Sequence, residues 1–216
     1  INIRTIMSNY QLFHNDLPVQ ALKSFKGDIS IDTETLGLNI KRDRLCLAQL
    51  RNEYNKKIYL IKFDSELSAK KSKNFKLIME NKSIKKVFHY ARFDMAILKE
   101  NLNINVKNIF CTKVASKLTR TYSSKHGLKD LVKELLNIEL DKNEQTSDWS
   151  RKNLSKKQIQ YAINDILYLS EIKMGMEEKL NELGRFKIFN SIMSFMETRV
   201  DLDLQGWSDT DIFAHK

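Results

Sequence analysis

Residues 27–37 read GDISIDTETLG, and this stretch decides the fold prediction. Apolar and polar residues alternate in it and β-branched side chains are frequent, a pattern that predicts a strand. Successive side chains of a strand point to opposite faces, so Asp32 and Glu34 share one face while Ile29 and Ile31 face a core. Adjacent carboxylates raise each other's pKa, and a divalent cation between them removes the repulsion. Taken alone, the pair is also compatible with a solvated strand end.

The remaining sequence predicts a mixed α/β sheet flanked by helices. Further strands are expected at 44–51 (RLCLAQLR), 56–61 (KKIYLI), 85–90 (KKVFHY) and 106–112 (VKNIFCT). Short polar gaps join the first two to the opening strand, which indicates a three-stranded meander. Helices are expected at 74–81, 93–102, 114–120, 127–138, 154–182 and 185–202.

The composition limits the classes of partner. The chain has 216 residues, with 37 Lys and Arg against 27 Asp and Glu, and a formal net charge of +10. A basic surface favours a polyanionic partner, first of all nucleic acid. No apolar run approaches the ~20 residues that a membrane span needs, so no membrane partner is expected. The two cysteines are far apart and lack metal-site spacing, which predicts buried thiols in a reducing compartment, the cytoplasm.

Two later segments carry acids at positions where they could contribute to a metal-binding or catalytic site. Asp94 follows the strand predicted at 85–90 and opens an apolar helix, where an acid can also serve as a cap or dipole partner. Tyr161 and Asp165 stand four residues apart, on one face of a mostly apolar helix. A buried acid needs a partner, and a structural hydrogen bond between the two side chains is the alternative to a functional role.

The order of these three motifs is informative. An Asp-x-Glu strand, an Asp about 60 residues later and a late Tyr-x-x-x-Asp resemble the DEDDy branch of the DnaQ-like 3′–5′ exonucleases. The text TSDWSRKNLSKKQIQYAINDILYL, residues 146–169, is similar to the ribonuclease D subgroup, and so is HGLKDLVKELL at 126–136. The resemblance covers about residues 14–182.

The resemblance implies a fold, a reaction and a catalytic set. The fold would be ribonuclease H-like, with five strands of which three antiparallel ones come first. Asp32, Glu34, Asp94 and Asp165 would hold two divalent cations, Mg²⁺ or Mn²⁺, and Tyr161 would orient the attacking water. The enzyme would be a hydrolase that acts on a free 3′ end of RNA or single-stranded DNA and releases 5′-mononucleotides. A catalytically silent nucleic-acid-binding module with the same fold is the alternative.

The resemblance also implies a pocket for the terminal nucleotide. Its candidate lining comprises Thr35, Leu36, Tyr90, Phe93 and His89, and ordinary packing is the competing role for each of them. Apolar and aromatic faces can stack on splayed bases without sequence preference. Basic residues around the late motif, and Arg92 beside Asp94, are candidates for phosphate contacts.

The domain prediction places the exonuclease domain at 1–184. Residues 185–216 form a helical C-terminal extension, apolar enough to pack on the domain or to support a homodimer. An additional nucleic-acid-binding domain, such as full-length ribonuclease D carries, is not expected.

Overall fold

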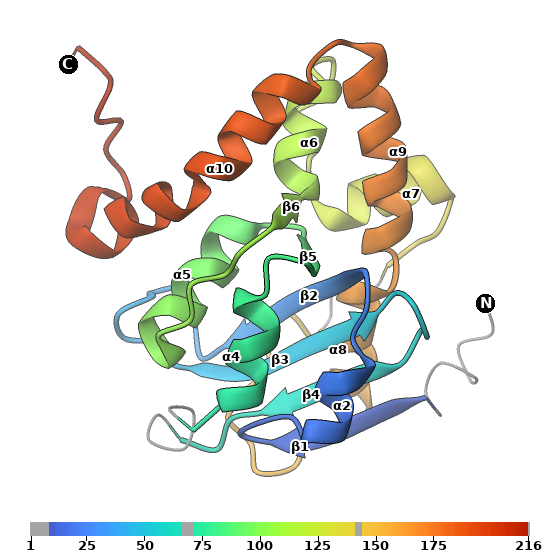
Figure 1. Ribbon diagram of the computed structural model, residues 1–216, viewed down its shortest axis with the longest axis vertical. Coiled ribbons are helices and arrows are strands. Elements are labelled where there is room, and N and C mark those ends of the chain that lie inside the picture. The colour runs from blue at the N-terminus through green and yellow to red at the C-terminus, as the bar shows by residue number, and fades with distance from the viewer. Residues whose placement is uncertain (1–8, 66–70, 141–143, 216) are drawn as a thin grey trace.

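One mixed sheet forms the centre of the computed structural model, which describes residues 9–65, 71–140 and 144–215 (Figure 1). Within these ranges the sheet has six strands in the order β1-β4-β3-β2-β5-β6. The strands are β1 (Tyr10–His14), β2 (Asp28–Thr35), β3 (Leu45–Asn52), β4 (Ile58–Lys62), β5 (Lys85–Phe88) and β6 (Ile109–Cys111). Strands β2, β3 and β4 pair antiparallel, whereas β1 joins β4, and β5 joins β2 and β6, in parallel.

The mixed sheet and its antiparallel meander are confirmed, but the predicted count of five strands is one too low. The additional strand, β1, precedes the meander in the chain and lies at the sheet edge beside β4. Its residues are exposed or half-buried, so its sequence YQLFH lacks the buried alternation by which the other strands are found.

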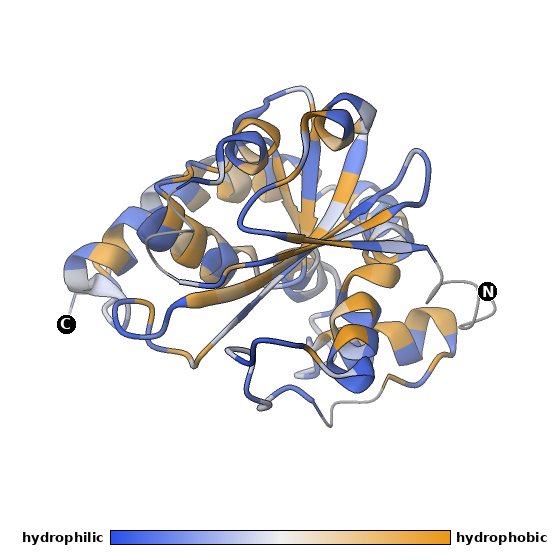
Figure 2. Cartoon of the chain, turned by 90° about the horizontal axis from the view of Figure 1, so that it is seen from below, coloured by the Kyte–Doolittle hydropathy of each residue, from blue (hydrophilic) through white to orange (hydrophobic). Residues whose placement is uncertain are grey.

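Helices cover both faces of the sheet. They are α2 (Val19–Ser24), α4 (Lys73–Glu80), α5 (Ala91–Leu102), α6 (Thr112–Thr119), α7 (Leu128–Leu136), α8 (Lys156–Leu167), α9 (Leu169–Glu182), α10 (Phe186–Leu202) and the π-helical turn η1 (Asp203–Trp207). One core is formed by the sheet with α2, α4 and α5, and the other by the sheet with α6, α7, α8 and α9. Figure 2 shows the apolar residues gathered between these layers.

The alternation along β2 separates the two cores. Ile29 and Ile31 are fully buried in the first core, as predicted. Ser30, Asp32 and Glu34 point to the other face, toward the layer that contains α8. The acids therefore lie on an internal face of the sheet, not at a solvated strand end.

The helical segment predicted at 154–182 is divided into α8 and α9. The break is at Tyr168, whose φ and ψ of −110° and 3° are not helical. After α9, α10 packs along the molecule through buried Phe189, Met196 and Val200, and Figure 1 shows it reaching α5. Among the described helices, none is long and apolar enough to cross a bilayer.

The central position of β3 gives a test of the fold. Leu50 is fully buried in the first core, so Leu50→Ala should lower the free energy of unfolding by about 2–5 kcal/mol. Leu77 on α4 is 58% exposed, and Leu77→Ala should change it by less than about 0.5 kcal/mol. Urea unfolding measures both, and equal losses would contradict the assigned burial.

Candidate active site

Two of the acids come from the central strand. Asp32 of β2 pairs with Gln49 of β3, and Glu34 pairs with Leu47, which places both carboxylates on one face of the sheet. The ladder shifts register between Glu34 and Thr35, so the regular pairing ends directly after the second acid. The pair therefore sits where β2 leaves the sheet.

A third acid comes from α8, which packs on this same face. The helix begins with a capping box in which Ser155 and Gln158 satisfy each other's backbone N–H groups. Gln158 Nε2 also donates to the carbonyl of Asp148, at 2.9 Å, and this contact anchors the helix start to the preceding loop. Asp165, in the last turn of α8, reaches the strand acids: one carboxylate oxygen each of Asp32, Glu34 and Asp165 lie within 4.8 Å of one another.

The fourth acid, Asp94, arrives from the opposite layer. It lies in the first turn of α5, is 3% exposed, and accepts a hydrogen bond of 2.7 Å from Thr33 Oγ1. Thr33 stands between the two acids of β2, so its side chain joins that strand to α5. Asp94 is outside the group of three mutually close oxygens, yet its charge acts on Asp32.

The electrostatics of the cluster oppose ionisation. Burial, followed by the charges of Asp94, Asp165 and Glu34, holds the pKa of Asp32 well above its usual value. Burial and the charges of Asp165 and Asp94 do the same to the pKa of Glu34. Burial raises the pKa of Asp94 to about 7, against the lowering effect of the Thr33 hydrogen bond. Without a cation, the cluster therefore retains protons at a pH where isolated carboxyls have lost them.

Tyr161 lies one helical turn before Asp165, at the edge of the cluster. Burial, the charge of Asp165 and a hydrogen bond to that carboxylate raise the pKa of the phenol above its usual value. The ring packs on Trp149, with the ring centroids 6.0 Å apart, and Trp149 is almost fully buried. The phenol is therefore held in place as a protonated hydrogen-bond donor.

Two polar residues of the site were not predicted from the sequence. Gln49 is fully buried and donates from Nε2 to Asp32 Oδ2 at 2.8 Å, and Thr33 holds Asp94. A signal for Gln49 is present, because it is a lone amide in the apolar run LCLAQL. Naming its partner requires the register of β3 against β2, which the sequence does not provide.

The side-chain hydrogen bonds to Asp32 and Asp94 come from neutral groups. Among the described residues, no lysine or arginine forms an ion pair with Asp32, Glu34 or Asp94, although the chain carries a net charge of +10. Amide and hydroxyl donors orient a carboxylate but do not neutralise it. The donor set consists of carboxylate oxygens, the hard ligands that suit Mg²⁺ or Mn²⁺.

The five candidate substrate residues border the acids in sequence and differ in exposure. Leu36 is 50% exposed and Tyr90 45%, whereas Thr35, Phe93 and His89 are half-buried. Lys113 Nζ lies 4.2 Å from the Tyr90 ring centroid and covers part of that ring. His89 Nδ1 lies 3.0 Å from Thr112 Oγ1, a contact that fixes the imidazole against α6.

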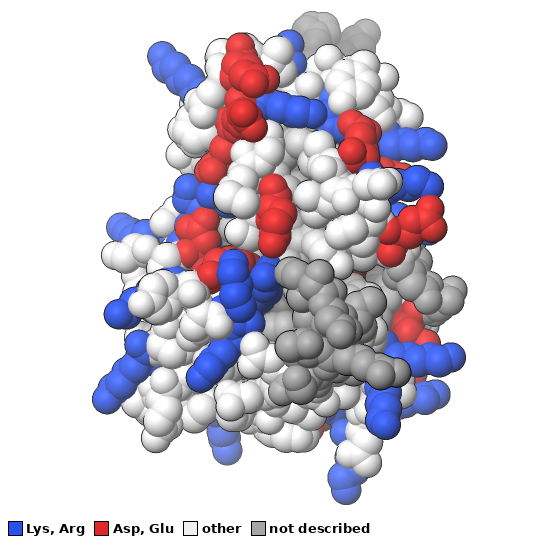
Figure 3. All heavy atoms as spheres, turned by 90° about the vertical axis from the view of Figure 1, so that its right-hand side faces the viewer, with Lys and Arg blue, Asp and Glu red and all other residues white. Residues whose placement is uncertain are grey.

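Arg92, one of the candidates for phosphate contacts, is bound by groups of the chain itself. Its guanidinium is bound by both carboxylate oxygens of Asp203 in η1, at 2.6 and 2.7 Å, and by the carbonyl of Ser208. The basic groups also form no single surface on the side shown in Figure 3, where acidic side chains lie among them.

Comparisons with known proteins identify the family of the chain. The 3′–5′ exonuclease family matches residues 13–181. Ribonuclease D of Sphingobium indicum is 32% identical over 158 residues, which are 73% of this chain and 39% of that protein. The chain thus spans about two fifths of this curated relative. Brucella melitensis NrnC is 41% identical, with a TM-score of 0.90 over 97% of this chain and 100% of that one.

Further solved structures extend the comparison. NrnC is also known bound to pGG, and with bound Mg²⁺. Escherichia coli RNase D has a TM-score of 0.74 at 21% identity, over 89% of this chain and 50% of that one, and so shares the fold. With the family match over most of its length, the chain belongs to the 3′–5′ exonucleases, in their ribonuclease D-like branch.

Proposed function

We propose that the chain is an active metal-dependent exonuclease, which removes 5′-mononucleotides from the 3′ end of RNA or single-stranded DNA. The observation that carries the proposal is the convergence of Asp32, Glu34 and Asp165 within 4.8 Å, with buried Asp94 beside them. A module that only bound nucleic acid would gain nothing from acids that repel its phosphates. Family membership and the pGG-bound state of NrnC support a short RNA as one substrate.

The four acids are the proposed ligands of two divalent cations. Mg²⁺ or Mn²⁺ held by these carboxylates would supply charge stabilisation for the attacking and leaving oxygens of a phosphodiester. Gln49 and Thr33 fix the orientations of Asp32 and Asp94, so the ligand oxygens need little rearrangement on binding.

Tyr161 has the role of orienting the attacking water. Because the pKa of its phenol is raised, the hydroxyl keeps its proton at neutral pH and acts as a donor, not as a base. Packing on Trp149 restricts the ring, which lowers the entropic cost of holding the water in line with the scissile bond.

The proposed pocket for the terminal nucleotide lies around the end of β2 and the start of α5. Thr35 and Glu34 would contact the 3′-hydroxyl, and Leu36 and Phe93 would lie against the base. Tyr90 and His89 would complete the lining. The half-exposed side chains of Leu36 and Tyr90 offer the apolar surface that base stacking requires.

The extension after residue 184 has a proposed second role as a homodimer contact. Ile188 is 54% exposed and Phe195 39% exposed on α10, although the opposite side of the helix is buried. The cytoplasm is the proposed location, since Cys46 and Cys111 are buried and unpaired with each other, as thiols of a reducing compartment are.

Digestion of a labelled strand tests the activity. The wild-type protein with Mn²⁺ should shorten a 5′-labelled RNA from its 3′ end, and EDTA should stop the reaction. Asp94→Asn should lower the rate by about 10³-fold or more, because it removes a ligand charge from the cluster. The control Glu139→Gln removes an equal charge at an exposed position and should leave the rate unchanged. Binding of the strand without shortening would favour the silent module.

The role of Tyr161 predicts a separation of kinetic constants. Tyr161→Phe retains the ring that packs on Trp149 and removes only the hydroxyl, so kcat should fall by about 10–100-fold. KM should stay within twofold, and Tyr54→Phe, at a 71% exposed residue, serves as the control. Unchanged kcat in Tyr161→Phe would exclude the orienting role.

The raised pKa values predict how stability depends on pH. An acid whose pKa is higher in the folded than in the unfolded state binds more protons when folded, so stability falls as pH rises between the two values. For Asp94 this window is from about pH 4 to about 7. Burial lowers the pKa of Lys86 to about 7, but that group acts above pH 7, where stability should rise.

Thermal unfolding in EDTA measures this dependence. The melting temperature of the wild type should fall between pH 5 and 7, and saturating Mn²⁺ should remove most of the decrease. Asp94→Asn should show a smaller decrease in EDTA than the wild type. Equal slopes for the two proteins would contradict the raised pKa of Asp94.

A further inference from the structure

A buried arginine lies on β3 close to the acid cluster but outside it. Arg51 is two residues after Gln49, so both side chains extend from β3 to the face that α8 covers. Only 4% of the Arg51 side chain is exposed. Its register partner on β2 is Ser30, two residues before Asp32. A guanidinium so deeply buried needs fixed partners.

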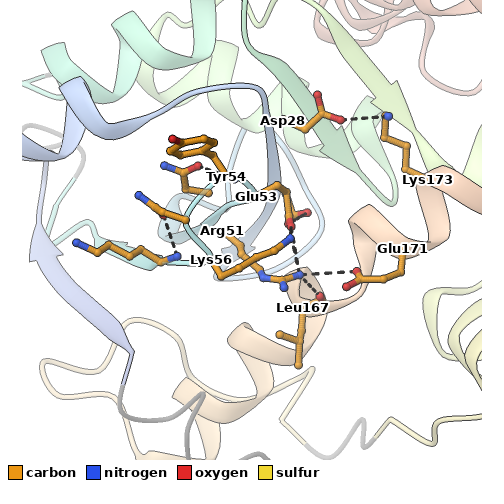
Figure 4. A network of polar contacts seen from close by, with 12 residues as sticks. Asp28, Arg51, Glu53, Tyr54, Lys56, Leu167, Glu171 and Lys173 are labelled. Atoms are coloured by element: carbon orange, nitrogen blue, oxygen red, sulfur yellow. Dashed lines mark hydrogen bonds and ion pairs between the residues drawn. The ribbon is translucent and has the colours of Figure 1, made fainter. Parts of the chain in front are cut away.

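The first partner of Arg51 is the end of α8. Its Nη1 donates to the carbonyl of Leu167, the last residue of that helix (Figure 4). The last carbonyls of a helix have no partner within the helix, and a cation there also interacts favourably with the helix dipole. Leu167 is two residues after Asp165. Arg51 therefore fixes the turn of α8 from which that acid extends.

The other partners of Arg51 are acids that hold the guanidinium in place. Nη1 lies 3.4 Å from Glu53 and 3.7 Å from Glu171, in the first turn of α9. Glu53 is itself held by Ser30 Oγ at 2.7 Å and by Lys56 Nζ at 2.8 Å. Figure 4 shows the guanidinium between the strand and the junction of α8 with α9. The backbone of Arg51 is held in β3 and its guanidinium is held by these partners. The side chain therefore keeps a fixed distance between β3 and the end of α8.

We propose that Arg51 is a positioning residue for Asp165. β3 then positions acids on two different elements. Its Gln49 orients Asp32 of β2, and its Arg51 fixes α8, the helix that carries Asp165. The distance between the two carboxylates then depends on the spacing of two side chains on β3. This inference rests on the proposed function, because it takes the four acids as the ligands of the cations.

A second link between the same layers provides a matched control. Lys173 of α9 forms ion pairs with Asp28 of β2, at 3.1 Å, and with Glu177, at 2.8 Å. Its side chain is 10% exposed, so its loss should also lower stability. However, its ion pairs tie α9 to β2 and include no residue of α8. Lys173→Met thus removes a buried cation and a layer contact but leaves the turn of Asp165 unchanged.

The test compares Mn²⁺ affinity, measured by calorimetry without substrate, with the kinetics of RNA digestion. In Arg51→Met we expect Mn²⁺ affinity to fall about tenfold and kcat to fall about 10–100-fold, with KM within twofold. Arg51→Lys retains a cationic donor and should recover part of both losses. Lys173→Met should keep both values within twofold of the wild type, even with a lower melting temperature. Arg51→Gln, which keeps a polar neighbour for Glu53, should behave like Arg51→Met and replaces it if that variant does not fold.

Three results would overturn the inference. Wild-type Mn²⁺ affinity in folded Arg51→Met or Arg51→Gln would show that Asp165 does not depend on Arg51. Equal losses of Mn²⁺ affinity and kcat in Lys173→Met would show that Arg51 contributes only to general stability. No recovery of these two values in Arg51→Lys would show the same. The calorimetry needs no turnover, so wild-type protein that binds Mn²⁺ without digesting RNA would contradict the proposed function and still allow the Arg51 comparison.

Discussion

Repulsion between buried carboxylates is the constraint on which the rest of the structure depends. Asp32, Glu34 and Asp94 have little access to water, and each has a pKa above its usual value. Such acids move apart where the structure allows it, and where the fold holds them together they retain protons or bind a cation. Together with Asp165 they come from a strand and from helices on both faces of the sheet, so relaxing the repulsion would require moving whole layers of the core. The packing of both cores therefore offsets the unfavourable free energy of this repulsion.

The choice of contacts around the acids follows from the same constraint. A lysine or arginine beside Asp32 would remove the repulsion, but it would also compete with a metal ion for the carboxylate. The chain places neutral donors there, Gln49 and Thr33, and keeps its nearby buried cation, Arg51, on a helix carbonyl. Each of these groups fixes the position of a carboxylate, or of the helix that carries one, without placing a positive charge directly beside Asp32 or Asp94. The negative potential of the cluster is therefore retained for a divalent ion.

How much the sequence could predict depends on how far apart along the chain the interacting residues are. Local periodicity was sufficient to place Asp32 with Glu34 and Tyr161 with Asp165, because periods of two and of about four residues are set by backbone geometry alone. The meeting of these pairs was inferred from the order of motifs in a family, not from local rules. Contacts such as Gln49 with Asp32 depend on strand register, and β1 depends on an edge that only the completed sheet offers. Arg92 illustrates the same limit, since its partner Asp203 is 111 residues away.

The contact between Arg92 and Asp203 also bears on where the functional unit ends. Arg92 is two residues before Asp94, and its carboxylate partner lies beyond the predicted boundary at residue 184. Arg199 of α10 binds the same Asp203, and Phe189, Met196 and Val200 are buried against the sheet layers. These contacts stabilise the start of α5, the turn from which Asp94 extends. The helical extension is therefore joined to the cluster through α5, much as Arg51 joins β3 to the end of α8. The two arginines on Asp203 thus connect the first turn of α5 with residues on the far side of position 184.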